Sequence, residues 1–325
     1  MKKLLIMTVI LFLIMVFFPL FALVDREESI TDSAQTTAAE STADNAENEE
    51  KAQETVSLMA SATGKVTEMT AGEYVYGAVC AEMPASFHSE ALKAQAVACY
   101  TYMKWLKENA DNPSAADITD SSALHQAYLS EEELKERWGS SYDIYSEKVK
   151  SAVESVLCEY LSYNNETAMT VYHGLSPGRT VSAAEIWGSD VPYLQSVTAP
   201  GDSLSPDISS EVRLTDEEFV KPFSGAEEKE AESIFKGISK DEEGFVSSIS
   251  YGKLKLSSTD LRSVYSLKSP FFKAEMDENG VLLTVYGKGH GVGMSQYSAD
   301  YMARQGSTYK EILAHFYQGT ELIVK

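Results

Sequence analysis

The chain opens with two lysines followed by a long apolar run. Lys2 and Lys3 precede residues 4–24, which are almost all apolar. As a helix these 21 residues would reach about 30 Å, the thickness of the hydrocarbon core of a bilayer. Because positive charge stays on the cytoplasmic side, we expect residues 1–24 to be a single-pass signal anchor in the cell membrane, with a cytoplasmic N-terminus and an extracytoplasmic domain. The alternative is a signal peptide cleaved at Ala22, which also exports the chain.

An acidic segment follows the apolar run. Residues 25–64 hold ten acidic side chains against Arg26 and Lys51, and they contain no aromatic residue. Such a segment cannot bury enough apolar surface to offset the entropy of the chain. It is predicted to be a disordered linker that holds a single domain, residues 65–325, away from the membrane.

The first part of this domain shows helical periodicity. Tyr74, Ala78 and Glu82 share one face of a helix that Pro84 ends. Ser130 and Glu133 have the spacing of a capping box, which opens another helix. The pattern predicts helices at 72–82, 88–108, from 131 onward and at 145–157.

The second part reads mainly as β-hairpins. Asn164-Asn165 and Glu278-Asn279-Gly280 are turn signals between apolar strands. The acidic segment 207–244 looks like an inserted lobe, after which the chain returns to the sheet. A glycine-rich loop, 287–293, leads into two closing helices, the second capped by Thr308 and Glu311. Strands are expected at 156–163, 167–173, 193–199, 245–249, 272–276 and 281–286. This order predicts an α+β fold, with helices flanking antiparallel hairpins.

Composition excludes several classes of function. The chain carries a formal charge of −22 and has no basic face, so we expect no nucleic-acid partner. Its three cysteines form no CxxC pair, and its five histidines form no HxxxH or HExxH pair. A disulfide framework and a zincin site are therefore excluded, and we expect no metal and no cofactor.

Glu82 is the strongest candidate for chemistry. It lies in the last turn of a predicted helix, where the helix dipole disfavours a negative charge, and Met83, Pro84 and Phe87 are apolar neighbours. Both effects raise the pKa of a carboxyl, which is what a general acid for a glycosidic oxygen needs. The alternative is that Glu82 is one of 49 acidic residues and merely solvated.

The glycine-rich run 287–293 matches neither a Walker loop nor a GxGxxG motif. Its alternate glycines permit close approach to a ligand or to another strand. The run is therefore either an ordinary connection or one wall of a cleft. In the second case Gln296 and Tyr297 beyond it would suit a sugar, because a sugar offers hydroxyls and CH faces.

Six ordered blocks of sequence together resemble the stage II sporulation protein D (SpoIID) family. They are GEYVYGAVCAEMPASF (72–87) with EALKAQAVA (90–98), HQAY (125–128), YHGLSPGRT (172–180), EIWG (185–188), YLQSV (193–197), and GHGVGMSQY (289–297) with the closing 309–320. The resemblance covers essentially residues 65–325.

The resemblance implies a lytic transglycosylase that cleaves the MurNAc–GlcNAc bonds of peptide-stripped peptidoglycan. It implies that Glu82 is the catalytic acid and base, and that the enzyme works with a partner amidase in engulfment during sporulation. Substrate-binding roles are expected at nine positions within or beside the family's motifs: Lys93, Tyr100, His125, Gln126, His173, Ser176, His290, Gln296 and Tyr297.

Two positions depart from the family's pattern. Tyr100 stands where the family usually has an arginine, and Leu175 stands where it has a hydroxyl-bearing residue. Some members bind zinc through cysteine and histidine near His125, but no cysteine lies between positions 100 and 157 here. These departures leave open a non-catalytic cell-wall-binding enhancer of a partner amidase and, as a weaker option, a hydrolase with the same fold.

Overall fold

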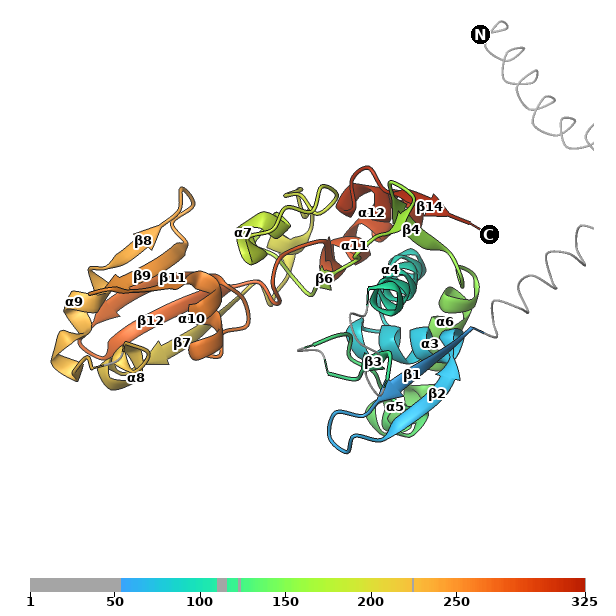
Figure 1. Cartoon of the computed structure of the whole chain (residues 1–325), viewed down its shortest axis with the longest axis horizontal. Helices are drawn as coiled ribbons and strands as arrows, with labels where there is room; N and C mark the ends of the chain where they lie inside the picture. The colour runs from blue at the N-terminus through green and yellow to red at the C-terminus, as the bar shows by residue number, and fades with distance from the viewer. Residues whose placement is uncertain (1–53, 110–115, 122–123, 224, 325) are drawn as a thin grey trace, which may run out of the picture. The chain divides into compact units, whose positions relative to one another are not determined.

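The structure, a computed structural model, describes residues 54–109, 116–121, 124–223 and 225–324. These residues all belong to one unit, Ala52–Lys325. They form a mixed α+β fold of helices and small, mostly antiparallel sheets (Figure 1). Within these ranges no helix is apolar and long enough to span a bilayer. The expected anchor, 1–24, and most of the expected linker lie outside the described residues.

Helix α4 (Ser89–Glu108) is the centre of the helical part. Eleven of its residues are buried, and many of them, such as Ala94, Val97 and Ala98, are small and apolar. Their small side chains allow neighbouring helices to approach closely. The helices in contact with it are α3 (Ala71–Glu82), α6 (Tyr142–Glu154), α11 (Gln296–Arg304) and α12 (Tyr309–Phe316). The predicted helices 72–82 and 88–108 are confirmed, whereas α6 begins three residues before the expected 145.

The predicted helix starts are confirmed by their caps. Ser130 and Thr308 each accept a hydrogen bond from the backbone N–H three residues later, and Glu133 and Glu311 reach back to the capping residues. Ser130 opens α5 (Glu131–Trp138), and Thr215 caps α8 (Asp216–Val220) in the same way.

The expected linker is ordered at its C-terminal end. Thr55–Met59 forms strand β1, which pairs with β2 (Val66–Thr70) and β3 (Ile118–Thr119). Val56 and Leu58 are buried because the segment TVSLM alternates polar and apolar residues. The strand was not predicted, because the acidic composition of 25–64 indicated a disordered linker. The ordered domain therefore starts before residue 65.

The first expected hairpin is present but shorter than predicted. Asn164 and Asn165 adopt positive φ between β4 (Tyr160–Tyr163) and β5 (Glu166–Thr167), and β14 (Glu321–Ile323) completes this sheet. The prediction of a strand at 193–199 is wrong. This segment instead forms a single bridge, between Arg179 and Thr198, and follows helix α7 (Ala183–Trp187).

Residues 209–286, called the lobe below, have a hydrophobic core of their own that includes Phe219, Ile234 and Phe272. The prediction that the lobe ends at 244 is wrong, because the next strand pairs within the lobe and does not return to another sheet. The hairpin predicted at 272–276 and 281–286 is confirmed. The lobe contains β7 (Ser209–Leu214), α8, α9 (Ala231–Phe235), β8 (Ile238–Lys240), β9 (Val246–Tyr251), β10 (Leu254–Ser257), α10 (Ser258–Val264), β11 (Phe271–Asp277) and β12 (Gly280–Tyr286).

After the lobe, the glycine-rich run lies against the segment 171–181. Strand β13 (Met294–Ser295) pairs in parallel with β6 (Tyr172–His173). Gly293 has a φ of +71°, and a Cβ there would lie 2.0 Å from the Val171 carbonyl oxygen. The buried Asp202 carboxylate fastens the same region, because it accepts hydrogen bonds from Ser176 at 2.7 Å and from the Ser295 hydroxyl at 2.8 Å.

The loop 124–129 packs directly on helix α3. The Tyr128 ring stacks on Tyr74, with ring centroids 6.1 Å apart, and Leu129 N–H donates to the Gly77 carbonyl oxygen. A Cβ on Gly77 would lie 2.3 Å from the Tyr128 ring and 2.9 Å from the Leu129 carbonyl oxygen. A residue larger than glycine at position 77 would therefore force the loop away from the helix.

We expect Gly77→Ala to destabilise the protein by roughly 1–3 kcal/mol, because overpacking at this contact outweighs the better helix propensity of alanine. Gly72→Ala is the matched control on the same helix, since its Cβ would meet the Leu157 side chain at 3.4 Å and Thr70 Oγ1 at 4.0 Å, which are ordinary van der Waals contacts. Urea unfolding of both variants checks this, and equal stability of the two would contradict the packing argument.

Candidate active site

A pocket of about 760 Å³ lies at the C-terminal end of α3. A second pocket, of about 500 Å³, shares Glu82, Lys268, Lys288 and Gln296 with the first. The two therefore adjoin at Glu82 and leave room for a ligand on both sides of its carboxyl. This volume is typical of pockets for small ligands and short polymer segments.

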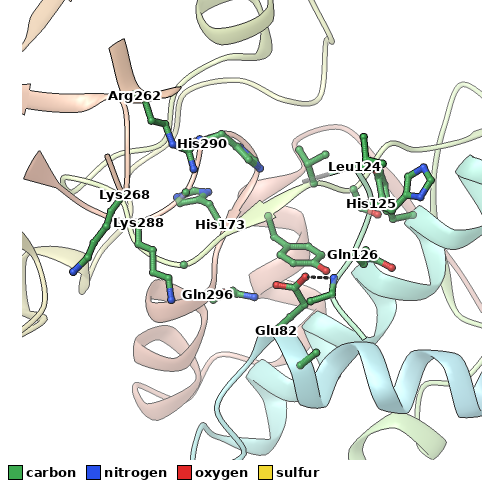
Figure 2. Close-up of a pocket in the computed structure, with 18 of the residues that line it drawn as sticks. Glu82, Leu124, His125, Gln126, His173, Arg262, Lys268, Lys288, His290 and Gln296 are labelled. Carbon is green, nitrogen blue, oxygen red and sulfur yellow. Dashed lines mark hydrogen bonds between the residues drawn. The ribbon is translucent and has the colours of Figure 1, made fainter. Parts of the chain in front are cut away.

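Glu82 is placed by the end of helix α3 and by the loop that packs on it. Met83 is extended, with φ of −121° and ψ of 137°, as expected for a residue before proline. Glu82 Oε1 accepts a hydrogen bond from Ala127 N–H at 2.7 Å, and Figure 2 shows this bond at the edge of the pocket. The helix end thus sets the position of the carboxyl and the loop sets its direction.

The environment of Glu82 favours the protonated carboxyl. Burial raises its pKa, while the Ala127 N–H, the Lys288 charge and the Tyr172 hydroxyl lower it, and burial has the larger effect. The net direction is upward, as the sequence predicts. A carboxyl of this kind keeps its proton closer to neutral pH than an exposed glutamate does, and it can act as a general acid.

Two residues beside Ala127 present polar groups to the pocket. Gln126 Oε1 accepts a hydrogen bond from the Tyr74 hydroxyl at 2.8 Å, whereas Gln126 Nε2 is buried and has no partner among the described residues. His125 Nδ1 accepts from Thr119 N–H at 2.9 Å, and burial lowers the pKa of His125. Both residues were predicted to bind substrate, and both line the larger pocket.

His173 and His290 lie together on another side of the pocket (Figure 2), with ring centroids 5.9 Å apart. Burial lowers the pKa of His173 to about 4 and that of His290 to about 3, so both rings are neutral at pH 7. His173 Nδ1 lies 3.1 Å from the Val292 carbonyl oxygen, which only accepts, so Nδ1 carries the proton. His173 Nε2 is therefore a bare acceptor, and no described residue is its partner.

The remaining predicted residues divide into two groups. Gln296 lines both pockets, and Tyr297 lines the smaller one, where its ring meets Phe87 edge to face. Lys93, Tyr100 and Ser176 line neither pocket.

Each residue of this second group is held by a partner elsewhere. Lys93 pairs with Glu90 at 2.8 Å, and the Tyr100 hydroxyl donates to Glu54 at 2.8 Å. Ser176 is fully buried, and its hydroxyl donates a hydrogen bond to the Asp202 carboxylate at 2.7 Å. None of these three side chains therefore lines either pocket, and their substrate-binding roles stay predictions.

Several pocket residues were missed by sequence reasoning. Tyr172 and Trp187 lay within the quoted motifs, and Trp187 is 43% exposed, with its ring 5.6 Å from that of His290. Lys288 was within the glycine-rich run. Arg262 and Lys268 had no local signal, because only the fold of the lobe brings them to the pocket.

The described part of the chain offers neither an activated thiol nor a cluster of metal-binding side chains. Cys80 and Cys99 are buried, and burial raises the pKa of both thiols to about 12, so neither is an activated nucleophile. No cluster of three or more histidine, cysteine, aspartate or glutamate side chains is arranged for a metal among these residues.

The sequence was compared with family models and with known proteins. The family model SpoIID, stage II sporulation protein, matches residues 59–163. Stage II sporulation protein D of Bacillus subtilis (strain 168) is 35% identical over 252 residues, which cover 77% of this chain and 73% of that protein. The chain belongs to the SpoIID family. The resemblance found in the sequence motifs is thereby confirmed.

The chain is also similar to two further Bacillus proteins. Stage II sporulation protein D of Bacillus amyloliquefaciens is 34% identical, with the same coverage of 77% and 73%. The amidase enhancer of Bacillus subtilis is 27% identical over 302 residues, which cover 76% of this chain and 40% of that protein. The range matched by the family model contains Glu82 and Gln126 but ends before His173 and before the lobe.

We expect Glu82→Gln to unfold at a higher temperature than the wild-type protein at about pH 7, with the difference closing near pH 4. The folded pKa of Glu82 is raised, so its contribution to stability is fully present at low pH and is lost as pH rises through that pKa. The glutamine still offers an oxygen to Ala127 N–H. Thermal melts at both pH values check this, with Glu136→Gln, exposed on α5, as control. A wild-type protein more stable than Glu82→Gln at pH 7 would contradict it.

Proposed function

We propose that the protein is a peptidoglycan lytic transglycosylase in which Glu82 serves as both acid and base. One observation carries the proposal. Among the described residues, Glu82 is the one carboxylic acid that lines both pockets, and burial raises its pKa, whereas Asp207 lines the smaller pocket alone. Hydrolysing glycosidases usually need two carboxylates across the scissile bond. An intramolecular transfer needs only one, because no water has to be activated.

The reaction balances with this one group. Protonated Glu82 donates its proton to the oxygen between MurNAc and GlcNAc, and the bond from this oxygen to the anomeric carbon of MurNAc breaks. The resulting carboxylate then accepts the proton of the muramic 6-hydroxyl, whose oxygen bonds to that carbon. The products are a free GlcNAc end and a 1,6-anhydro ring, and Glu82 is protonated again.

The surrounding residues suit a sugar polymer. The two adjoining pockets offer sugar sites on both sides of Glu82. Trp187 and Tyr297 provide flat apolar surfaces for CH faces. His173 Nε2 is free to accept a hydrogen bond from a sugar hydroxyl, and Gln126 Nε2 is free to donate one to an acetamido or ring oxygen, because both atoms are otherwise without partners among the described residues.

The cellular setting is part of the proposal. The apolar run after Lys2 and Lys3 supports a membrane anchor with the domain outside the cell membrane. Relatives named stage II sporulation protein D support a role in sporulation, for which we propose engulfment. The relative named amidase enhancer supports a partner amidase.

The same relative favours a second candidate, a non-catalytic enhancer that binds the cell wall for an amidase. Tyr100 also favours it, since this residue replaces the family's arginine and is bonded to Glu54 instead of lining the cleft. The retained, desolvated Glu82 favours the enzyme.

We expect purified peptide-free glycan strands to yield 1,6-anhydromuramic ends with the wild-type protein. Glu82→Gln should lower the rate by at least about 100-fold, the usual contribution of a general acid. Mass spectrometry of the products measures this, and Glu136→Gln is the matched control. Reducing ends in place of anhydro ends would show a hydrolase. Binding without any product would show the enhancer.

We expect the rate to fall as pH rises above the pKa of Glu82, because only the protonated form donates. Lys288→Met should move this falling limb of kcat/KM to higher pH, since the Lys288 charge lowers the pKa of Glu82. Lys255→Met, exposed on β10 of the lobe, removes an equal charge away from both pockets and should leave the limb in place. A limb that moves to lower pH in Lys288→Met would contradict the role of Glu82.

A further inference from the structure

A groove of about 700 Å³ lies between β2, α3 and α6, and it is called the tyrosine groove below because Tyr76, Tyr128 and Tyr142 line it. None of the described residues that line it lines either pocket at Glu82. The loop 124–129 borders both, since residues 124–127 line the larger pocket whereas Tyr128 and Leu129 line the groove. A molecule in the groove can therefore contact this loop without blocking the candidate active site.

One wall of the tyrosine groove is the open edge of a sheet. β1 lies between β2 and β3 (Figure 1), so β2 pairs on one side only among the described strands. Residues 67–70 of β2 all line the groove. Since successive side chains of a strand point to opposite faces, consecutive residues line the same groove where it runs along the edge of the strand. The open edge of β2 therefore faces the groove, and it can pair with an added strand.

The hydrogen bonds of the hairpin show which backbone groups are free at this edge. At its turn, Ala60 N–H donates to the Lys65 carbonyl oxygen at 2.8 Å. Because bonded and non-bonded pairs alternate in an antiparallel ladder, Thr67 and Met69 also bond to β1, whereas the N–H and the carbonyl of Glu68 point to the open edge. Glu68 therefore offers one donor and one acceptor to an added strand.

The three tyrosines give the groove firm, partly buried surfaces. The Tyr76 hydroxyl forms a hydrogen bond of 2.8 Å to α6, and the Tyr128 ring stacks on Tyr74. Lys135 Nζ lies 5.5 Å from the ring centroid of Tyr142, so a lysine side chain already packs on one of these rings. Because the rings are held in place, further aliphatic or cationic side chains can pack on them at little cost in conformational entropy.

The tyrosine groove is acidic. The charged side chains that line it, among the described residues, are Glu68, Glu73, Glu131, Lys150 and Glu154. Lys150 lies 4.0 Å from Glu154, and Lys135 beside the groove pairs with Glu131 at 2.6 Å. The groove keeps a negative charge when both lysines are counted, and Glu68 forms no ion pair with a described residue. These side chains are exposed, so they select the charge of a partner more than they set its affinity.

This charge excludes two occupants that the chain itself could supply. The segment 25–53, which precedes β1, is acidic, and a second copy of the chain carries the same −22. Both are repelled by the glutamates of the groove. An extended segment of another protein, with basic side chains, has the complementary charge and the backbone that the edge of β2 can pair with.

We propose that the tyrosine groove docks an extended, basic segment of a partner protein, which adds as a strand to the open edge of β2. Alternate side chains of the segment meet the glutamates, and the others pack on the tyrosines. The docked segment contacts Tyr128 and Leu129, so the partner reaches the loop that binds Glu82. The inference is independent of the proposed function, because an enzyme and an enhancer can both dock a partner here.

The first test measures binding of a short, fluorescein-labelled peptide of alternating lysine and valine to the full chain by fluorescence anisotropy. We expect Glu68→Lys to weaken binding about fivefold, because it reverses the charge at the open edge. Glu275→Lys is the matched control, since Glu275 is an exposed strand glutamate on β11 that does not line the groove, and it should bind as the wild type does. Equal binding by Glu68→Lys and the wild type would overturn the inference.

The second test uses the wild-type chain and changes the peptide, so it stands even if Glu68→Lys fails to fold. One version of the peptide is N-methylated at its lysines and another at its valines. An added strand pairs through one of its two edges, so one version should lose binding and the other should keep it. Equal binding of the two versions would contradict strand addition, because a contact between charges does not depend on one backbone edge.

Two further outcomes would also overturn the inference. Asp207 is an exposed acid that lines the smaller pocket at Glu82. Binding that is lost in Asp207→Lys and kept in Glu68→Lys would place the peptide in that pocket. A stable dimer of the wild-type chain that the peptide dissociates would assign the tyrosine groove to a second copy.

Discussion

Burial of the Glu82 carboxyl is the constraint on which the rest of the site depends. An acid at the end of α3 would be an ordinary exposed glutamate if the loop 124–129 did not pack over it. That packing rests on the stacking of Tyr128 on Tyr74 and on the absence of a side chain at Gly77. The loop removes water from the carboxyl, which raises its pKa, and supplies one N–H that fixes its direction.

The acid and the surfaces that face it come from distant parts of the chain. The helical core around α4 positions Glu82 and the Ala127 N–H, while the segment 172–174 and the glycine-rich run bring His173, Lys288 and His290. Asp202 joins these last two segments by binding both Ser176 and Ser295. The helical part thus holds the acid, while the surface that faces it comes from these two segments and from the lobe.

The chemistry proposed for the site depends on one buried carboxyl, Glu82, with a raised pKa and on several neutral acceptors. His173 and His290 are kept uncharged by burial, so in the proposed reaction they do not compete for the proton that Glu82 must hold. The cations are the remaining charged groups of the pocket among the described residues. The proposed enzyme therefore depends on the buried Glu82 carboxyl, which an enhancer that only binds the cell wall would not need.

Features that depend on neighbours within one or two turns could be predicted from the sequence. Capping boxes at Ser130, Thr215 and Thr308, the helix end before Pro84 and the hairpin turns at Asn164 and Asn279 are interactions over a few residues, so they can be read locally. Other features could not be predicted from it: the Tyr100 hydroxyl donates to Glu54, Ser176 donates to Asp202, and Arg262 and Lys268 line the pocket that contains Glu82. Those partners are tens to hundreds of residues apart, and burial between such segments is set by how they pack, which local periodicity does not encode.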